Sequence, residues 1–94
     1  MSWSIIYHKE VEHDLKSIGN FAAKRILRAI DSKLTKAPLD FGQPLTGNLS
    51  PLRKLRVGDY RIVYHVTTHE VVVYVLAVGP RRDKEIYTMA SKRT

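Results

Sequence analysis

Lysine, arginine and tyrosine side chains recur in the second half of the sequence at spacings that would let them act on one phosphate group. Lys54 and Arg61 lie in two neighbouring runs of alternating apolar and polar residues, and Arg81 and Tyr87 follow a third run. A guanidinium group pairs with phosphate through two hydrogen bonds, and an aromatic ring can stack on a base. This combination favours binding of a nucleotide chain.

Each of these side chains also has a purely structural alternative. Arg61 could pair with Glu70 or Glu85 across a sheet, Tyr87 could pack its ring on the core, and Lys54 could protect an edge strand from aggregation. The joint placement of the cations and the ring favours a functional role for Arg61, Arg81 and Tyr87. For Lys54 the two interpretations stay balanced.

The four histidines and the absence of cysteine argue against several other kinds of site. No histidine has a partner at a metal-ligand or catalytic spacing, and His65, which would share a strand face with Arg61, is as a lone histidine more typical of a solvated or packed side chain. We therefore expect no metal, no cofactor and no disulfide. The lack of cysteine also favours a reducing compartment.

The overall charge points to a polyanionic partner. Sixteen Lys and Arg residues against nine Asp and Glu give 94 residues a formal charge of +7. Such an excess suits nucleic acid, an acidic protein or an anionic membrane surface. There is no basic leader before an apolar run and no stretch near the roughly 20 apolar residues of a membrane helix, so we expect a cytoplasmic protein of one domain, 1–94.

The first half of the chain predicts a strand and a helical hairpin. Residues Trp3–Tyr7 have the character of a short strand. Apolar residues at helical spacing then predict a helix ending at Gly19, and Asn20 is a good N-cap for a second helix with one apolar stripe. The stripes are formed by Val11, Leu15 and Ile18 and by Ala22, Ile26, Ala29, Ile30 and Leu34. Proline and glycine residues in 37–50 predict a long loop.

The second half predicts a three-stranded antiparallel meander. Arg53–Val57 and Tyr60–Thr67 flank the turn-forming pair Gly58-Asp59, and Val71–Val78 is apolar on both faces, as in a central strand. Lys84–Ala90 is expected to form a short terminal helix capped by Asp83. The fold class is α+β, with the first strand joining the meander in one sheet.

Alternation along the strands assigns side chains to faces of this sheet. Lys54 and Arg56 project together, and Arg53 projects the other way. On the next strand Arg61 shares its face with Val63, and the opposite face, made of Tyr60, Ile62, Tyr64 and Val66, is expected to be the core side. The cations are therefore expected on the face turned away from the core.

Two segments resemble a known family. Residues 55–64 (LRVGDYRIVY) and 78–87 (VGPRRDKEIY) are similar to the signatures of the RelE/ParE toxin superfamily, and the second is typical of the RelE branch because it keeps Arg81 and Tyr87. The resemblance extends over essentially the whole chain. It implies a toxin of a type II toxin–antitoxin system that cleaves mRNA in the ribosomal A site by attack of the 2′ hydroxyl, without a metal.

The resemblance also implies roles for individual residues. Arg61 would hold the scissile phosphate, Arg81 would stabilise it and protonate the leaving 5′ oxygen, and Tyr87 would help activate the 2′ hydroxyl or stack on a base. Lys54 would stabilise developing negative charge. One departure is Leu52, which stands where a typical member has a basic residue. RNA and ribosome contacts are expected from Arg53, Arg56 and Arg82.

Partners follow from the same resemblance. A cognate RelB-like antitoxin is expected to wrap the helical hairpin and the sheet, operator DNA to be bound only through that antitoxin, and no membrane to be bound. Two other functions remain open. One is a ParE-type toxin that inhibits DNA gyrase without cutting nucleic acid, which Arg81 and Tyr87 argue against. The other is a basic RNA-binding domain without chemistry.

Overall fold

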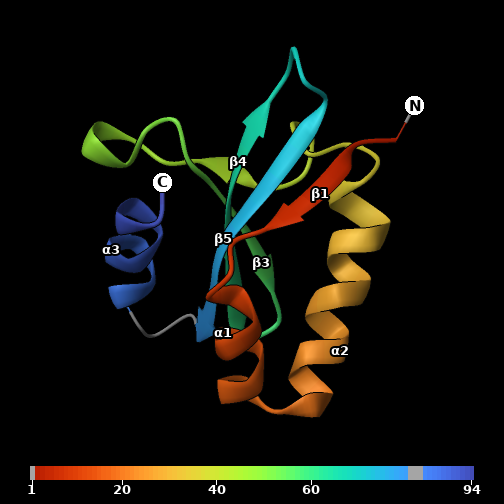
Figure 1. Cartoon of the computed structure of the whole chain (residues 1–94), viewed down its shortest axis with the longest axis vertical. Coiled ribbons are helices and arrows are strands. Elements are labelled where there is room, and N and C mark those ends of the chain that lie inside the picture. The colour runs from red at the N-terminus through yellow and green to blue at the C-terminus, as the bar shows by residue number, and fades with distance from the viewer. Residues whose placement is uncertain (1, 81–83) are drawn as a thin grey trace.

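The structure is a computed structural model that describes residues 2–80 and 84–94. One central sheet lies between helices, with α3 on one side and α2 on the other (Figure 1). In chain order the elements are β1 (Ser4–Tyr7), α1 (Val11–Ile18), α2 (Asn20–Ala29), β2 (Gln43–Pro44), β3 (Arg53–Val57), β4 (Tyr60–Thr67), β5 (Val72–Pro80) and α3 (Glu85–Lys92).

The five strands are arranged in the order β1-β5-β4-β3-β2. β3, β4 and β5 form an antiparallel meander, and β1 joins it by lying parallel to β5, with Ser4 paired to Val72. The α+β fold expected from the sequence is thus confirmed. The expected loop 37–50 contains an additional strand, β2. The sequence did not predict it, because two residues that include Pro44 are too few to show an alternating pattern.

The helical hairpin covers one face of the sheet with the larger apolar core. α1 and α2 are separated by Gly19, which has a φ of 88° and so adopts a backbone conformation that favours glycine. Burial of each large aliphatic side chain contributes about 1.5–3 kcal/mol to folding. The buried residues of this core are Val11, Ile26, Ile30, Leu34, Leu55, Ile62, Tyr64, Val73, Val75 and Val78.

α3 covers the opposite face with a second, smaller core. Its Ile86 and Ala90 pack there with four buried residues of the sheet and the preceding loop, namely Leu52, Val63, Leu76 and Ala77. The core side expected for β4 is correct at Ile62 and Tyr64, which are fully buried. Val63, expected on the face away from the core, is also 0% exposed, because α3 closes over it.

A β-bulge adapts β5 to these two cores. Val63 pairs with Ala77 and Tyr64 pairs with Val75, so that Leu76 is an extra residue with no partner in β4. Leu76 and Ala77 consequently both contribute to the core under α3, whereas Val75 and Val78 contribute to the core under the hairpin. Without the bulge, successive residues would alternate between the two faces, and Leu76 and Ala77 could not share one.

Several element ends differ from the sequence predictions. Asn20 is the first residue of α2 and Gly19 is its N-cap, so the predicted capping role of Asn20 is wrong. The helical stripe continues from α2 through a π-helical segment, Ile30–Leu34. The predicted cap of α3, Asp83, lies outside the described residues. Among the described helices, none is long and apolar enough to cross a membrane.

Candidate active site

The β3–β4 hairpin brings three cationic side chains to one face of the sheet. Arg56 and Arg61 are directly paired across the two strands, and Lys54 is paired with Val63, the residue two positions beyond Arg61. Like charges directly opposite each other destabilise an antiparallel pair. None of the ion pairs within residues 2–80 and 84–94 involves these three cations. The hairpin therefore presents positive charge that the described residues leave uncompensated.

Arg61 is held by a residue of the C-terminal helix. Its Nη1 donates a hydrogen bond to the hydroxyl of Tyr87, and its guanidinium carbon lies 5.9 Å from the centre of the Tyr87 ring. The adjacent residue Ile86 is buried in the core under α3, and this packing places Tyr87 beside the beginning of β4. The structure thus brings together two residues that are 26 positions apart in the sequence.

An open pocket of about 320 Å³ lies beside these residues. Lys54, Arg56 and Arg61 line it, together with Leu55, Gly42 and the first residue of β2, Gln43. A pocket lined by three cations suits a phosphate-bearing ligand better than an apolar one. The cations predicted from the alternation of β3 and β4 therefore converge on one concave surface.

Arg53 is separated from this pocket by the sheet. Its guanidinium group donates hydrogen bonds to the carbonyl oxygens of Leu39 (3.0 Å) and Gly42 (3.5 Å), and its Nε lies 3.5 Å from the hydroxyl of Tyr64. The alternation placed Arg53 on the face opposite Lys54, and the hydrogen bonds show that it secures a loop there. Its predicted RNA contact finds no support in this geometry.

Tyr64 fixes the same loop from inside the core. The hydroxyl of this fully buried residue lies 2.8 Å from the carbonyl oxygens of both Pro38 and Phe41. Burial raises the pKa of Tyr64 above its ordinary value of 10.0, and the neighbouring guanidinium of Arg53 lowers it in part. Because the loop continues into Gly42, Tyr64 and Arg53 together support one wall of the pocket.

Two predicted site residues, Arg81 and Arg82, lie outside the described residues. The nearest described residues before and after them are Pro80, which ends β5 opposite Tyr60, and Lys84, which is the N-cap of α3. The segment that contains the two arginines therefore connects the strand next to Arg61 with the helix that carries Tyr87.

Leu52, the departure from the family pattern, has a clear structural role. It is 3% exposed and belongs to the core under α3, with Val63 and Ile86 among its neighbours. A basic side chain could not occupy that position without burying its charge. The position that would hold a further cation is used here to pack the helix that carries Tyr87.

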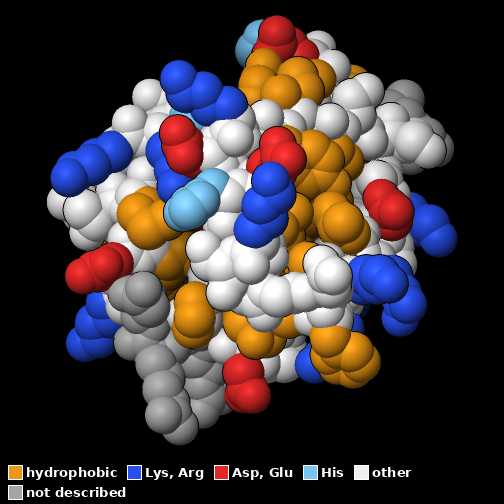
Figure 2. All heavy atoms as spheres, turned by 60° about the horizontal axis from the view of Figure 1, so that its bottom comes forward, with side chains coloured by type: hydrophobic (Ala, Val, Ile, Leu, Met, Phe, Trp, Pro, Cys, Tyr) orange, Lys and Arg blue, Asp and Glu red, His pale blue; other side chains and the backbone are white. Residues whose placement is uncertain are grey.

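The net charge alone does not locate the site. On the face that Figure 2 shows, Lys and Arg side chains are spread out, with acidic and apolar side chains between them. His65, the histidine expected to share a strand face with Arg61, lines a different, mainly apolar pocket of about 360 Å³ with His8 and Tyr74. Within the part of the chain that the structure describes, no three His, Cys, Asp or Glu side chains are grouped to hold a metal ion.

A comparison with models of protein families gives a match over residues 5–85. The matching family is described as the ParE toxin of type II toxin–antitoxin systems, parDE. The chain belongs to this toxin family. The resemblance to the RelE/ParE toxin superfamily that residues 55–64 and 78–87 carry is thereby confirmed.

The relatives of this toxin with curated names are RelE proteins. It is 50% identical over 40 residues to the mRNA interferase toxin RelE of Escherichia coli strain K12 and, to the same extent, to the mRNA interferase RelE of Shigella flexneri. Each match covers 43% of this chain and 42% of the relative, so the chain is aligned with less than half of the length of either protein.

Solved structures show the same fold. A mutant of the E. coli toxin RelE in the free state superimposes with a TM-score of 0.80 at 25% identity, covering 99% of this chain and 98% of that one. The toxin–antitoxin complex RelBE2 of Mycobacterium tuberculosis gives a TM-score of 0.81 at 22% identity over 86% of this chain and all of the other. The RelE–RelB complex of Pyrococcus horikoshii gives 0.65 at 29% identity, covering 86% and 97%.

Proposed function

We propose that this toxin is a metal-independent endoribonuclease that cuts mRNA in the A site of the ribosome and so stops translation. The observation that carries the proposal is the contact of Arg61 with Tyr87 beside a pocket lined by Lys54 and Arg56. A module that only blocks another protein has no need for a guanidinium and a phenol held together over a cationic pocket. The names of the RelE relatives, which are mRNA interferases, support the same reaction.

The chemistry requires little beyond positioning and positive charge. The 2′ oxygen attacks the adjacent phosphorus, the bond from phosphorus to the 5′ oxygen breaks, and a 2′,3′-cyclic phosphate and a 5′ hydroxyl result. One proton leaves the 2′ hydroxyl and one is delivered to the 5′ oxygen. The intermediate phosphorane carries two negative charges, so fixed cations lower the barrier.

The described residues can be assigned to parts of this reaction. Arg61 would bind the scissile phosphate, because its guanidinium is fixed by Tyr87 at the margin of the pocket. Lys54, which lines the same pocket, would stabilise the developing charge. Tyr87 would contact the nucleotide at its 2′ hydroxyl or its base. Protonation of the leaving oxygen is assigned to Arg81 on the family resemblance alone.

The ribosome would supply the substrate in the required shape. In-line attack needs a bent RNA backbone, which a small open pocket cannot impose on a free strand. The charge of +7 would draw the protein to ribosomal RNA, and Arg56 and Arg82 would add contacts to RNA. Free mRNA is therefore expected to be a poor substrate.

An antitoxin of the RelB type is the proposed partner. The solved structures similar to this chain include RelE in complex with RelB from Pyrococcus horikoshii and E. coli RelE in complex with a peptide of the antitoxin RelB. The antitoxin would wrap the helical hairpin and the sheet, and it would provide the contact with operator DNA.

The proposal is tested by primer extension on a defined mRNA carried by programmed ribosomes, with a ribosome-free control. Arg61→Ala should lower cleavage by roughly 10²–10³, the usual cost of removing one group that stabilises a transition state. Arg28→Ala is the matched control, since it removes the same side chain from the exposed surface of α2. Arg61→Ala should still bind antitoxin, and Arg28→Ala should cleave as the unaltered protein does.

Cuts within the A-site codon that require ribosomes and disappear in Arg61→Ala would support the proposal. Intact mRNA with the unaltered protein would contradict it. The same preparation would then be tested for inhibition of DNA supercoiling by gyrase, the activity expected of the ParE alternative. The matching family is described as the ParE toxin, so this alternative is the next to test.

A further inference from the structure

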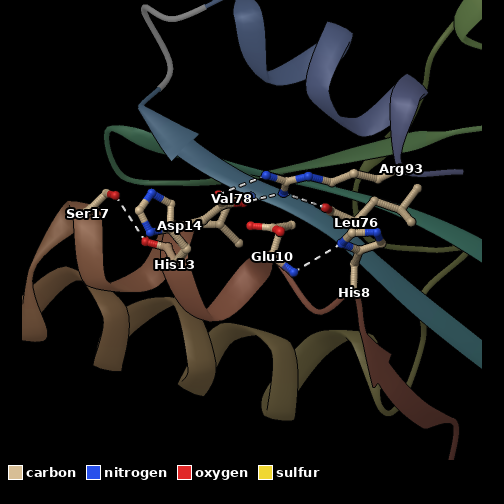
Figure 3. A network of polar contacts seen from close by, with 8 residues as sticks. All are labelled: His8, Glu10, His13, Asp14, Ser17, Leu76, Val78 and Arg93. Carbon is tan, nitrogen blue, oxygen red and sulfur yellow. Dashed lines mark hydrogen bonds and ion pairs between the residues drawn. The ribbon is translucent and has the colours of Figure 1, made fainter.

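Asp14 of α1 and Arg93, the residue after α3, form an ion pair that is nearly removed from solvent (Figure 3). Their side chains are 4% and 14% exposed. The guanidinium group donates two hydrogen bonds to the carboxylate, from Nη1 to Oδ2 at 2.7 Å and from Nη2 to Oδ1 at 3.2 Å. This two-point contact fixes the orientation as well as the distance of the two groups.

The pair also completes the hydrogen bonding of β5. β1 pairs with β5 only as far as Val75, and beyond it none of the described strands lies on that side of β5. There the amide of Val78 donates to Oδ2 of Asp14 at 3.1 Å, and the carbonyl of the bulged Leu76 accepts from Nη1 of Arg93 at 2.9 Å. Both groups are buried, so either would be costly if left unpaired.

α3 depends on contacts of this kind for its position. A helix of eight residues is marginal in water, and α3 buries only two apolar side chains fully, Ile86 and Ala90. Near its beginning Tyr87 is bonded to Arg61, and immediately after its end Arg93 is bonded to Asp14 and Leu76. The ion pair thus ties the far end of the helix to both α1 and the sheet.

We propose that Asp14 and Arg93 are positioning residues for Tyr87. By fixing the end of α3, they keep the tyrosine hydroxyl within hydrogen-bond distance of Arg61 although they lie outside the pocket themselves. The catalytic part of this inference rests on the proposed RNA cleavage. The structural part, that the pair holds α3 on the sheet, does not.

The structural part is tested by amide hydrogen exchange in three variants of the full chain. In Arg93→Ala the amides of α3 should exchange faster, while those of β4 should keep their protection. Lys92→Ala is the control, because it removes a neighbouring positive charge that is exposed and should leave α3 unchanged. Arg93→Lys keeps the charge and should restore part of the protection. Unchanged exchange of α3 in Arg93→Ala would overturn the proposal.

The variant Asp14→Asn distinguishes a loosened α3 from general unfolding of the protein. Asparagine retains a carbonyl oxygen for the amide of Val78 but loses the charge that pairs with Arg93. Its sheet should therefore stay intact while α3 loosens. Loss of protection throughout β4 and β5 in this variant would show a general role in stability and would overturn the proposal.

The catalytic part is tested by a double-mutant cycle on A-site cleavage, corrected for the folded fraction. Arg93→Ala should lower kcat by about 10- to 100-fold, a usual cost of misplacing a catalytic group, and leave the KM for programmed ribosomes unchanged. In a Tyr87→Phe background the same change should cost little more, since the hydroxyl to be positioned is already absent. Fully additive effects would overturn the proposal.

A failure of the proposed function and a failure of the positioning role can be told apart. If the unaltered protein does not cleave mRNA, the proposed function is wrong, and the exchange of α3 still decides whether the pair holds the helix. If the unaltered protein cleaves and Arg93→Ala cleaves equally well, the proposed function stands and the positioning role is wrong.

Discussion

The hydroxyl of Tyr64 is expected to stabilise the fold far more than the hydroxyl of Tyr74 on the neighbouring strand β5. In Tyr64→Phe, the carbonyls of Pro38 and Phe41, each 2.8 Å from the hydroxyl, lose this partner, and Pro38 is fully buried. A buried group left without its hydrogen bond costs about 1–3 kcal/mol. We therefore expect the free energy of unfolding to fall by about 2 kcal/mol.

Urea unfolding followed by circular dichroism measures this loss. In thermal unfolding of a domain of this size, each kcal/mol of lost stability lowers the Tm by about 4–8 °C, so the Tm should fall by roughly 8–16 °C. Tyr74→Phe is the control, because its hydroxyl is exposed and lies 3.5 Å from Glu70. That variant should remain within about 0.5 kcal/mol of the unaltered protein.

Equal unfolding midpoints for the two phenylalanine variants would refute the reasoning. Such a result would mean that the loop 38–42 does not depend on the hydroxyl it surrounds. A second consequence can be checked in the same samples: because the loop forms one wall of the pocket, Tyr64→Phe should weaken binding of a short single-stranded RNA, whereas Tyr74→Phe should not.

Two further predictions concern the same loop. Since burial raises the pKa of Tyr64 above 10.0, its contribution to stability is complete below about pH 10 and is lost as the pH rises through the folded-state pKa. In alkaline urea titrations the difference in unfolding free energy between the unaltered protein and Tyr64→Phe should therefore narrow. A constant difference would contradict the burial effect. Gly42→Ala should destabilise more than Gly47→Ala. Both glycines have positive φ (74° and 63°), which costs alanine about 1–2 kcal/mol. Only at Gly42 would the new Cβ clash with the Tyr64 hydroxyl, whereas at Gly47 it would meet nothing within 4 Å. Equal melting temperatures of the two alanine variants would show that the loop has room to move.

The sheet was predictable because its signals are local. The pair Gly58-Asp59 lies between two alternating runs, and this fixes the register in which Arg56 faces Arg61. The helical hairpin is marked in the same way by the apolar stripes on either side of Gly19. Both patterns depend on residues close in the chain, so they can be recognised without knowledge of the tertiary structure.

The covering of the second face was harder to predict. Alternation correctly assigned Ile62 and Tyr64 to the main core, but it could not show that α3 would bury Val63 from the other side. Leu52 was noticed only as a departure from the family pattern, although its apolar character is what the core under α3 requires. A helix that returns to the sheet from a distant part of the chain gives no local signal on the strand it covers.

The Asp14–Arg93 pair was not predicted at all. Its partners are 79 positions apart, so no spacing rule connects them. One signal was available: Asp14 lies between Val11 and Leu15 on the apolar stripe of α1, where a charged residue must find a buried partner. The identity of that partner could come only from the structure.

The parallel pairing of β1 with β5 has a consequence for how the protein folds during synthesis. Ser4 pairs with Val72, whereas β3, β4 and β5 pair with their neighbours in the chain. Contacts between distant residues form late, because a long loop must close before they are made. The N-terminal strand is made first but should thus join the sheet last, after the meander that bears the cations has formed.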